Sequence, residues 1–505
     1  MSVPTVRRAF GSISKQRSLY SVRDRLHFGI LVHLFNIALA LVLLPLNNTI
    51  LLAAYTAGYL SFVLSRSDPI QRRQAALRDV QFYPKTILVT GVDTPHGLAV
   101  ARSCYHQGHR VVGVSVTETA IPSGESMSKA LGAFYRIPKT KYVSRLLDVI
   151  NREKADVWVP CSEKASVLDD AMAKQVIEGR TECKCITMDT ELASMFGRPA
   201  TFRQYLVEKE LPVVENHQVQ SRDSIHKILH RSPTKTYRIS RPDPVTRENK
   251  IITLPKRTLS LTYSEVSEIQ ISKESPWTLQ QQSRLGEFLA EMLVVHGHVK
   301  AIKVRPADDQ STWGRSRLDE GLTMSIHKLM ERFALKGGYR MTGHICVRVM
   351  VDEEVDANQV RYALHINGCT QGAGAVNDLL QDASEQLVRG YLSVEAPHLN
   401  GFMASDSVDA LRIQAAQSIV STTPRPKFSL YQKLKEHDDE NLFTVLYPVA
   451  QHIDTLISGT ERALMFWRDW RFSIHDPLPW WWDAHVYQPL KELESIVSGA
   501  EVKEA

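Results

Sequence analysis

The chain has 505 residues and a formal net charge of +6 at pH 7, with 23% charged residues. This length allows several domains of roughly 100 to 200 residues each. The near-average charge content predicts a mostly globular protein and excludes a predominantly disordered one. The six cysteines include no CxxC pair, which indicates buried thiols in a reducing, cytosol-facing compartment.

Basic residues crowd the N-terminus, and we assign residues 1–25 as a basic leader. Aromatic residues do not alternate with the basic ones, so the pattern favours an anionic membrane surface over a nucleic acid as a partner. The basic residues before and after the first apolar stretch are Arg7, Arg8, Lys15, Arg17, Arg23, Arg25, Arg66, Arg72, Arg73 and Arg78.

Residues 26–65 contain no Asp, Glu, Lys or Arg. This stretch is nearly twice the roughly 20 residues needed to cross a bilayer. Because Pro45-Leu46-Asn47-Asn48 lies near its middle, we predict a membrane anchor made of a helical hairpin, with a single tilted span as the alternative. Both flanks are basic, so the soluble domains are expected to face the cytoplasm.

The segment KTILVTG, from Lys85 to Gly91, begins a strand, loop, helix and strand order that repeats as far as CKCITMD. This order predicts a parallel, Rossmann-like sheet over residues 85–195. Between Thr90 and Gly97 the dinucleotide fingerprint is incomplete, because a second close glycine and a later acidic residue are missing. An NAD(P)-dependent reductase is therefore a third alternative for the function.

The next motifs are the strand DVWVPCSE, the passage Phe196-Gly197-Arg198, and Glu210-Leu211-Pro212-Val213. Their order resembles the ATP-grasp superfamily, whose members join carboxylates to amines through an acyl phosphate. Asp476-Pro477-Leu478-Pro479 adds a narrower resemblance to the mycosporine-glycine synthetase branch. The resemblance implies an α/β fold class. The membrane hairpin over 26–65 is followed by a Rossmann-like pre-ATP-grasp domain over 85–195 and a two-lobed ATP-grasp α+β domain over 196–400. A linker over 401–440 then leads to a C-terminal helical segment over 441–505.

The resemblance also implies residues that bind ATP. Those that match the phosphate-binding positions are Arg198 and, on a later strand, Arg238 or Arg241, and those that match the adenine hinge are Gln280 and Gln281.

At the metal positions the chain departs from the family pattern. His365 and Asn367 match the ligands of the last strand, but Arg348 and His365 stand where the family has acidic residues for magnesium. An arginine repels a divalent cation, and imidazole is a poor magnesium ligand. Magnesium is implied by the resemblance but lacks its expected acidic ligands.

Two functions follow from the resemblance. One is an ATP-dependent carboxylate–amine ligase of small-molecule, secondary-metabolite biosynthesis, which joins an amino acid to an acid or enol beside other enzymes of one pathway. The other is a catalytically degenerate relative that acts as a membrane-tethered scaffold or binding partner.

Three further patterns have a structural interpretation. His296-Gly297-His298 predicts a hairpin turn. Asp352 to Glu354 predict an acidic, solvated turn. The tryptophans Trp480 to Trp482 predict packing of the last helix onto the protein, with a membrane-interface belt as the alternative.

Overall fold

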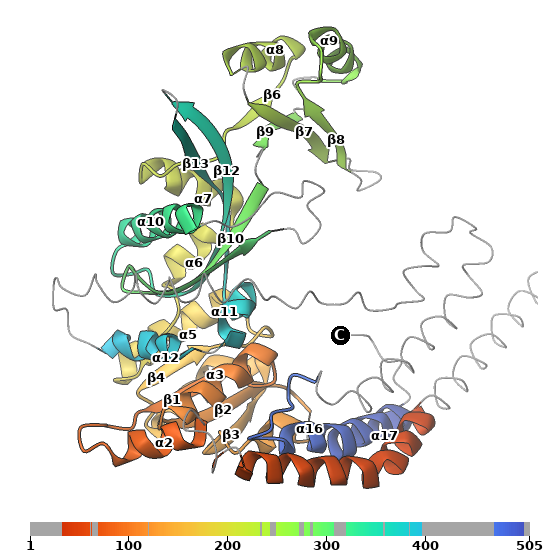
Figure 1. Ribbon diagram of the computed structural model, residues 1–505, viewed down its shortest axis with the longest axis vertical. Coiled ribbons are helices and arrows are strands. Elements are labelled where there is room, and N and C mark those ends of the chain that lie inside the picture. The colour runs from red at the N-terminus through yellow and green to blue at the C-terminus, as the bar shows by residue number, and fades with distance from the viewer. Residues whose placement is uncertain are drawn as a thin grey trace, which may run out of the picture. The chain divides into compact units, whose positions relative to one another are not determined.

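The computed structural model has an α/β architecture (Figure 1). Contacts divide the chain into two compact units: unit 1 comprises residues 1–85, 92–138 and 420–505, and unit 2 comprises residues 86–91 and 139–419. The residues that the structure describes are 33–60, 62, 69–119, 121–232, 235–242, 249–271, 277–282, 286–307, 320–356, 359–382, 384–395 and 469–498. The basic leader and the linker predicted over 401–440 lie outside them.

A five-stranded sheet has the strand order β3-β2-β1-β4-β5. β1 pairs in parallel with β4, β4 with β5, and β2 with β3. Nearly every residue of β1, β2 and β4 is buried, as expected for parallel strands covered on both faces. The predicted strands KTILVTG and DVWVPCSE, and the repeated strand and helix order between them, are thus confirmed. The bounds are β1 (Thr86–Thr90), β2 (Arg110–Val116), β3 (Ala133–Ile137), β4 (Val157–Pro160) and β5 (Lys184–Cys185).

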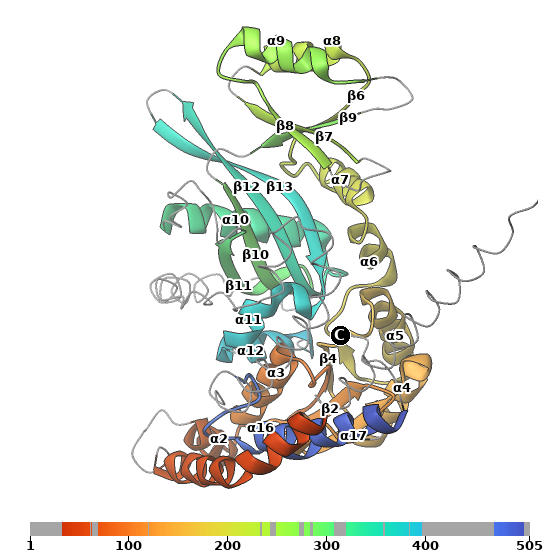
Figure 2. The ribbon, with the colours of Figure 1, turned by 90° about the vertical axis from the view of Figure 1, so that its right-hand side faces the viewer.

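Unit 2 continues with two four-stranded antiparallel sheets, in the orders β6-β9-β7-β8 and β11-β10-β12-β13 (Figure 2). We call them the small sheet and the large sheet. The small-sheet strands are β6 (Asn216–Val219), β7 (Thr236–Pro242), β8 (Asn249–Leu254) and β9 (Trp277–Gln282). The large-sheet strands are β10 (Gly286–Val295), β11 (His298–Pro306), β12 (Gly343–Asp356) and β13 (Gln359–Gln371).

Each of these sheets buries one face against helices. The small sheet packs on α8 and α9 through a core that includes Ile225, Val266 and Leu279. The large sheet packs on α6, α7 and α10 through a larger core that includes Phe333 and Ile366. The helices of unit 2 are α4 (Tyr142–Glu153), α5 (Val167–Arg180), α6 (Thr190–Phe196), α7 (Pro199–Glu208), α8 (Arg222–Arg231), α9 (Leu259–Glu268), α10 (Glu320–Gly337), α11 (Asn377–Asp382) and α12 (Glu385–Leu392).

The turn predicted at His296-Gly297-His298 is confirmed. It joins β10 to β11, with positive φ at both His296 (51°) and Gly297 (78°). Glycine accepts this conformation without strain, and the two left-handed residues give the twist that a tight hairpin needs. The histidines are therefore explained by the fold alone.

The predicted membrane hairpin is wrong. A single N-terminal helix, His33–Leu60, continues through Pro45 without a break. Asn47 and Asn48 were expected to form a turn, but they bind side chains from the other end of the chain. Asn47 Nδ2 lies 2.9 Å from His485 Nε2, and Asn48 Oδ1 accepts a hydrogen bond from Trp481 Nε1 at 2.9 Å. These contacts offset part of the roughly 3 kcal/mol that an interior proline costs a helix.

The N-terminal helix is 28 residues long and strongly apolar. Among the described residues it is the one helix whose length and composition suffice to cross a bilayer. Core helices of soluble proteins and signal sequences can have the same length and apolar composition. Its length alone therefore does not decide how it meets a membrane.

The C-terminal segment belongs to unit 1. Its elements are α16 (Leu478–Trp482), a π-helical turn (Asp483–Tyr487) and α17 (Gln488–Ser498), and the same unit contains α2 (Pro69–Arg78) and α3 (Pro95–His106). Arg102 Nε donates to Asp476 at 3.0 Å, and Arg471 Nε donates to Glu125 at 2.6 Å. Trp480 is only 1% exposed, which confirms the prediction that this tryptophan packs onto the protein.

A buried acid in unit 2 makes stability depend on pH. Burial raises the pKa of Asp170 to about 7, although a 2.7 Å hydrogen bond from Tyr142 Oη lowers it. The unfolded pKa is about 3.9, so this group's stabilising effect is complete below that value and is lost as pH rises through the folded value. We expect Asp170→Asn to be more stable than the natural protein at pH 8 and to have a flatter stability profile between pH 4 and 7, measured by denaturant unfolding. Asp148→Asn, at an exposed acid of α4, is the control; identical profiles for the natural protein and Asp170→Asn would contradict the assignment.

Candidate functional site

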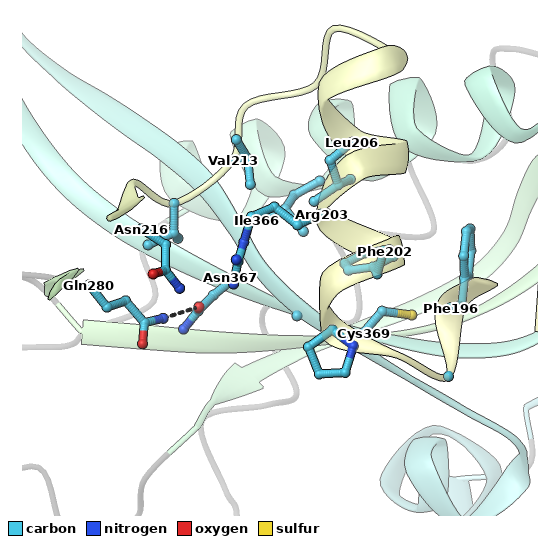
Figure 3. A pocket seen from close by; sticks show the side chains of 14 residues that line it. Phe196, Phe202, Arg203, Leu206, Val213, Asn216, Gln280, Ile366, Asn367 and Cys369 are labelled. Carbon is cyan, nitrogen blue, oxygen red and sulfur yellow. Dashed lines mark hydrogen bonds between the residues drawn. The ribbon is translucent and has the colours of Figure 1, made fainter. Parts of the chain in front are cut away.

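A cavity of about 160 Å³ lies in unit 2, where α7, β9 and β13 meet (Figure 3). Phe202 and Leu206 of α7 form one wall together with Ile366 of β13. Gln280 and Asn367 supply amide groups to the opposite end. The cavity is smaller than the roughly 300–1,000 Å³ of clefts that hold drug-sized ligands, so a nucleotide would need it to open.

A chain of polar contacts begins at the cavity, with Gln280 and Asn367, and continues along the large sheet. Gln280 Nε2 donates to Asn367 Oδ1 at 2.7 Å, and Asn367 Nδ2 donates to Glu287 Oε1 at 2.8 Å. Arg348 Nη1 lies 3.1 Å from Glu287 Oε2. The side-chain amide of Asn367 thus connects the two sheets, and Glu287 connects it to a cation.

Asn367 reaches these partners because β13 is irregular at this point. Arg348 pairs with Gly368, but the next residue, Val349, pairs with Ile366, so Asn367 is the extra residue of a β-bulge. A bulge turns a side chain away from its regular direction and is frequent beside functional sites.

Gln281 forms a second connection between the sheets. Its backbone N–H donates to the Glu215 carbonyl at 2.9 Å, and its Nε2 donates to Asp352 Oδ2 at 2.9 Å. Gln281 is 4% exposed, and its Oε1 is buried without a hydrogen-bond partner among the described residues. A buried acceptor of this kind suits a ligand that supplies a donor, such as the amino group of adenine.

A charged group flanks this connection. Burial raises the pKa of Glu215, but hydrogen bonds from Lys235 Nζ at 2.8 Å and Tyr237 Oη at 2.9 Å outweigh burial and hold the pKa below its usual value. Glu215 is therefore ionised at neutral pH. Its partner Lys235 directly precedes β7, which pairs with β9.

The three arginines predicted to bind phosphates lie in different surroundings. Arg238 of β7 pairs directly with Gln280 of β9, so the two side chains lie on the same face of the small sheet. Arg198 is an exposed residue between Gly197 and Pro199, which line the cavity. The backbone of Arg241 lies opposite Lys250, but the Arg241 side chain lies outside those described.

His365, which was predicted to bind metal, lies on the same face of the large sheet as the positively charged Arg348. Val349 and Ile366 point into the core, so Arg348 and His365 point away from it on the same face of the large sheet. The described residues contain no group of three or more His, Cys, Asp or Glu side chains able to hold a metal ion. The side chains present do not fit a magnesium site of the kind that the resemblance implies.

Two acidic residues of this region were not predicted to be part of it. Asp352 was expected in a solvated turn, and this is wrong: it lies within β12 and accepts from Gln281. No role was predicted for Glu287, although it lies only five residues after the end of β9. The available signal was its position at the start of β10, next to the apolar run Phe288 to Val295.

Comparisons with known proteins give a fold likeness only. No family model matches the sequence, and no curated protein matches it. The biotin carboxylase subunit of pyruvate carboxylase is similar at a TM-score of 0.47 and 12% identity, covering 63% of this chain and 71% of that chain. An L-amino acid ligase from Bacillus licheniformis is similar at 0.36 and 13%, covering 59% and 74%.

N5-carboxyaminoimidazole synthetase from Staphylococcus aureus is similar at a TM-score of 0.35 and 12% identity, covering 57% of this chain and 71% of that chain. Each of these TM-scores lies below 0.5. The likenesses by themselves therefore assign neither a family nor an activity to this chain.

The contact between the two sheets is measurable. In a double-mutant cycle of Gln280→Ala and Asn367→Ala, we expect a coupling of about 0.5–1.5 kcal/mol in the free energy of unfolding, the net value of one hydrogen bond. The control is a cycle of Gln280→Ala with Gln204→Ala, because Gln204 bonds within its own helix to Glu208. That control is expected to be additive, and a Gln280–Asn367 cycle that is also additive would mean that the sheets are not joined here.

Proposed function

We propose that this chain is a catalytically degenerate relative of the ATP-grasp superfamily, which binds an adenine nucleotide without magnesium and acts as a membrane-associated binding or scaffold protein. The observation that carries the proposal is Arg348, which Glu287 holds at 3.1 Å on the face that the resemblance assigns to magnesium ligands. The domain bounds given from the sequence remain predictions.

The architecture supports the family. A parallel α/β sheet is followed in the chain by two four-stranded antiparallel sheets, and these last two meet at a small cavity. This is the arrangement that the sequence resemblance implies. The order of elements supports it across unit 2, whereas single motifs are loosely matched.

The charges support binding without a divalent cation. A triphosphate needs its negative charge neutralised, which magnesium ordinarily does. Arginine offers a permanent positive charge and a fork of donors that matches phosphate oxygens. Arg348 and Arg238 lie on the faces of the two sheets that Gln280, Asn367 and Glu287 connect, so the chain can supply that charge itself.

A second candidate is the ligase of small-molecule biosynthesis, including the narrower mycosporine-glycine synthetase-like branch. Glu287 and Asn367 are 2.8 Å apart, and carboxylate and amide oxygens are hard ligands of the type that magnesium prefers. This candidate requires Arg348 to leave Glu287 before a metal can bind. The ligase would also need two substrates, an acid or enol and an amino acid, whereas the first candidate needs neither.

The reductase has less support. Thr94 Oγ1 accepts from Gly97 N at 3.1 Å, so the start of α3 is capped by the chain's own side chain. A dinucleotide phosphate at this helix start would have to displace that contact. We do not pursue this alternative.

Titration of the full-length protein with ATP, in magnesium and in EDTA, tests the proposal. We expect similar affinities in both, no ADP release on adding amino acids, and binding weakened roughly 10- to 100-fold by Arg348→Ala, the value of a charge-assisted hydrogen bond. Arg340→Ala is the matched control, because Arg340 is equally exposed and ion-paired, to Asp189.

Two other outcomes decide against this reading. Binding that requires magnesium and is followed by ADP release would establish the ligase. If ATP binds neither in magnesium nor in EDTA, the nucleotide part of the proposal is wrong and only the scaffold role is left.

A further inference from the structure

The N-terminal helix has two different faces. One face is apolar and exposed along the whole length, and it includes Leu34 (49% exposed), Leu41 (66%), Leu52 (66%) and Tyr59 (69%). The other face is turned toward the protein, with Asn47 fully buried. The apolar face thus has no cover among the described residues, while His33, Asn36 and Asn47 lie on the side that contacts the C-terminal segment.

Figure 2 shows the N-terminal helix beside α16 and α17. The order of the contacts along the chain makes the two segments antiparallel. His33 forms a short contact with Glu492, and Asn36 Nδ2 donates to Glu492 Oε1 at 3.2 Å. Further along, Asn47 contacts His485 at 2.9 Å. These contacts span half of the helix, and the Asn48–Trp481 bond lies beside them.

This pairing is incompatible with a helix that crosses a bilayer. If the helix crossed, α17 would have to enter the lipid with it, together with the charged residues Lys491, Glu492 and Glu494. A charge at the bilayer centre costs at least roughly 2.5–3.5 kcal/mol. Breaking the pairing instead would leave Asn36 and Asn47 without partners in hydrocarbon, which is also unfavourable.

A helix with one apolar and one polar face is stable along a membrane surface, where the apolar side enters the boundary between headgroups and acyl chains. The charges nearby favour an anionic surface. Arg72 and Arg78 are exposed on α2, which follows this helix, and six basic residues occur in the leader before it. Basic residues near such a surface each contribute about 1 kcal/mol of attraction.

We propose that the N-terminal helix lies in the plane of an anionic membrane surface, with its apolar face in the lipid and its polar face on α17. The occupant of the apolar face is lipid. This proposal deepens the membrane association that is part of the proposed function, and it is independent of nucleotide binding, so failure of either one leaves the other testable.

Depth measurements distinguish a helix in the plane from one that crosses. Spin labels on Cys at Leu34, Leu41 or Tyr59, which share the exposed apolar face, are placed in the full-length protein, with Cys369 changed to Ser because the other native cysteines are buried. The protein is bound to phosphatidylcholine vesicles with and without phosphatidylserine. We expect all three labels at one depth, about 5–10 Å below the headgroups, and binding at least roughly tenfold weaker without the anionic lipid.

A crossing helix gives a different pattern. Leu34 and Tyr59 are 25 residues apart in the chain, which is about 37 Å along a helix. Both ends would then lie near the borders of the roughly 30 Å core, and Leu41, about 10 Å along the helix from Leu34, would lie inside it. That result would overturn the proposal. Labels that contact no lipid, as when a second copy of the chain covers the face, would overturn it as well.

Variants provide an independent check. Leu41→Glu with Leu52→Glu adds charge to the exposed face without touching the contacts to α17, and vesicle binding is expected to fall at least roughly tenfold. Leu335→Glu, at an exposed leucine of α10 in unit 2, is the control and is expected to bind normally. Equal binding by both variants would contradict the proposed orientation, and circular dichroism verifies that each variant is folded.

Discussion

The ion pair between Arg348 and Glu287 sets the charge on the face of the large sheet that points away from the core, beside the contact between the two sheets. Two unit charges at about 4 Å attract or repel by roughly 4 kcal/mol at an effective dielectric near 20. With Arg348 in place, a divalent cation would meet repulsion where a carboxylate would attract it, and the nearest carboxylate already has a partner. The same guanidinium attracts phosphate oxygens, so this arginine both opposes a divalent cation and favours an anionic ligand.

Glu287 also connects this pair to the contact between the two sheets. Asn367 accepts from Gln280 and donates to Glu287, so both ends of its amide are used. Each such bond is worth only about 1 kcal/mol net, because water replaces it when it breaks. Water, or a ligand with matching donors and acceptors, can therefore replace these contacts at modest cost.

The sequence was sufficient for elements that depend on local chemistry. Continuous apolar runs predicted β1 and β4, and Gly297 predicted the hairpin turn, because these signals act over a few residues. The predictions that failed depended on distant partners. Asn47 and Asn48 next to Pro45 favour a turn locally, but His485 and Trp481 give them hydrogen bonds within a helix. Asp352 has the composition of a turn, yet Gln281, 71 positions earlier in the chain, binds it within a strand. The bulge that redirects Asn367 has no local signature at all.

The form of the N-terminal helix has a consequence for orientation. A hairpin and a helix in the plane of the membrane both leave their two flanks on the same side, whereas a single span separates them. The reasoning from basic flanks therefore applies unchanged to the in-plane helix, although the hairpin on which it was first based is absent. An in-plane helix also needs no translocation of charge, and it allows the contact with α17, a segment more than 400 residues later in the chain, to form in water. The polar residues inside the apolar stretch are then neither a turn nor a defect: they are the side of the helix that the rest of the protein binds.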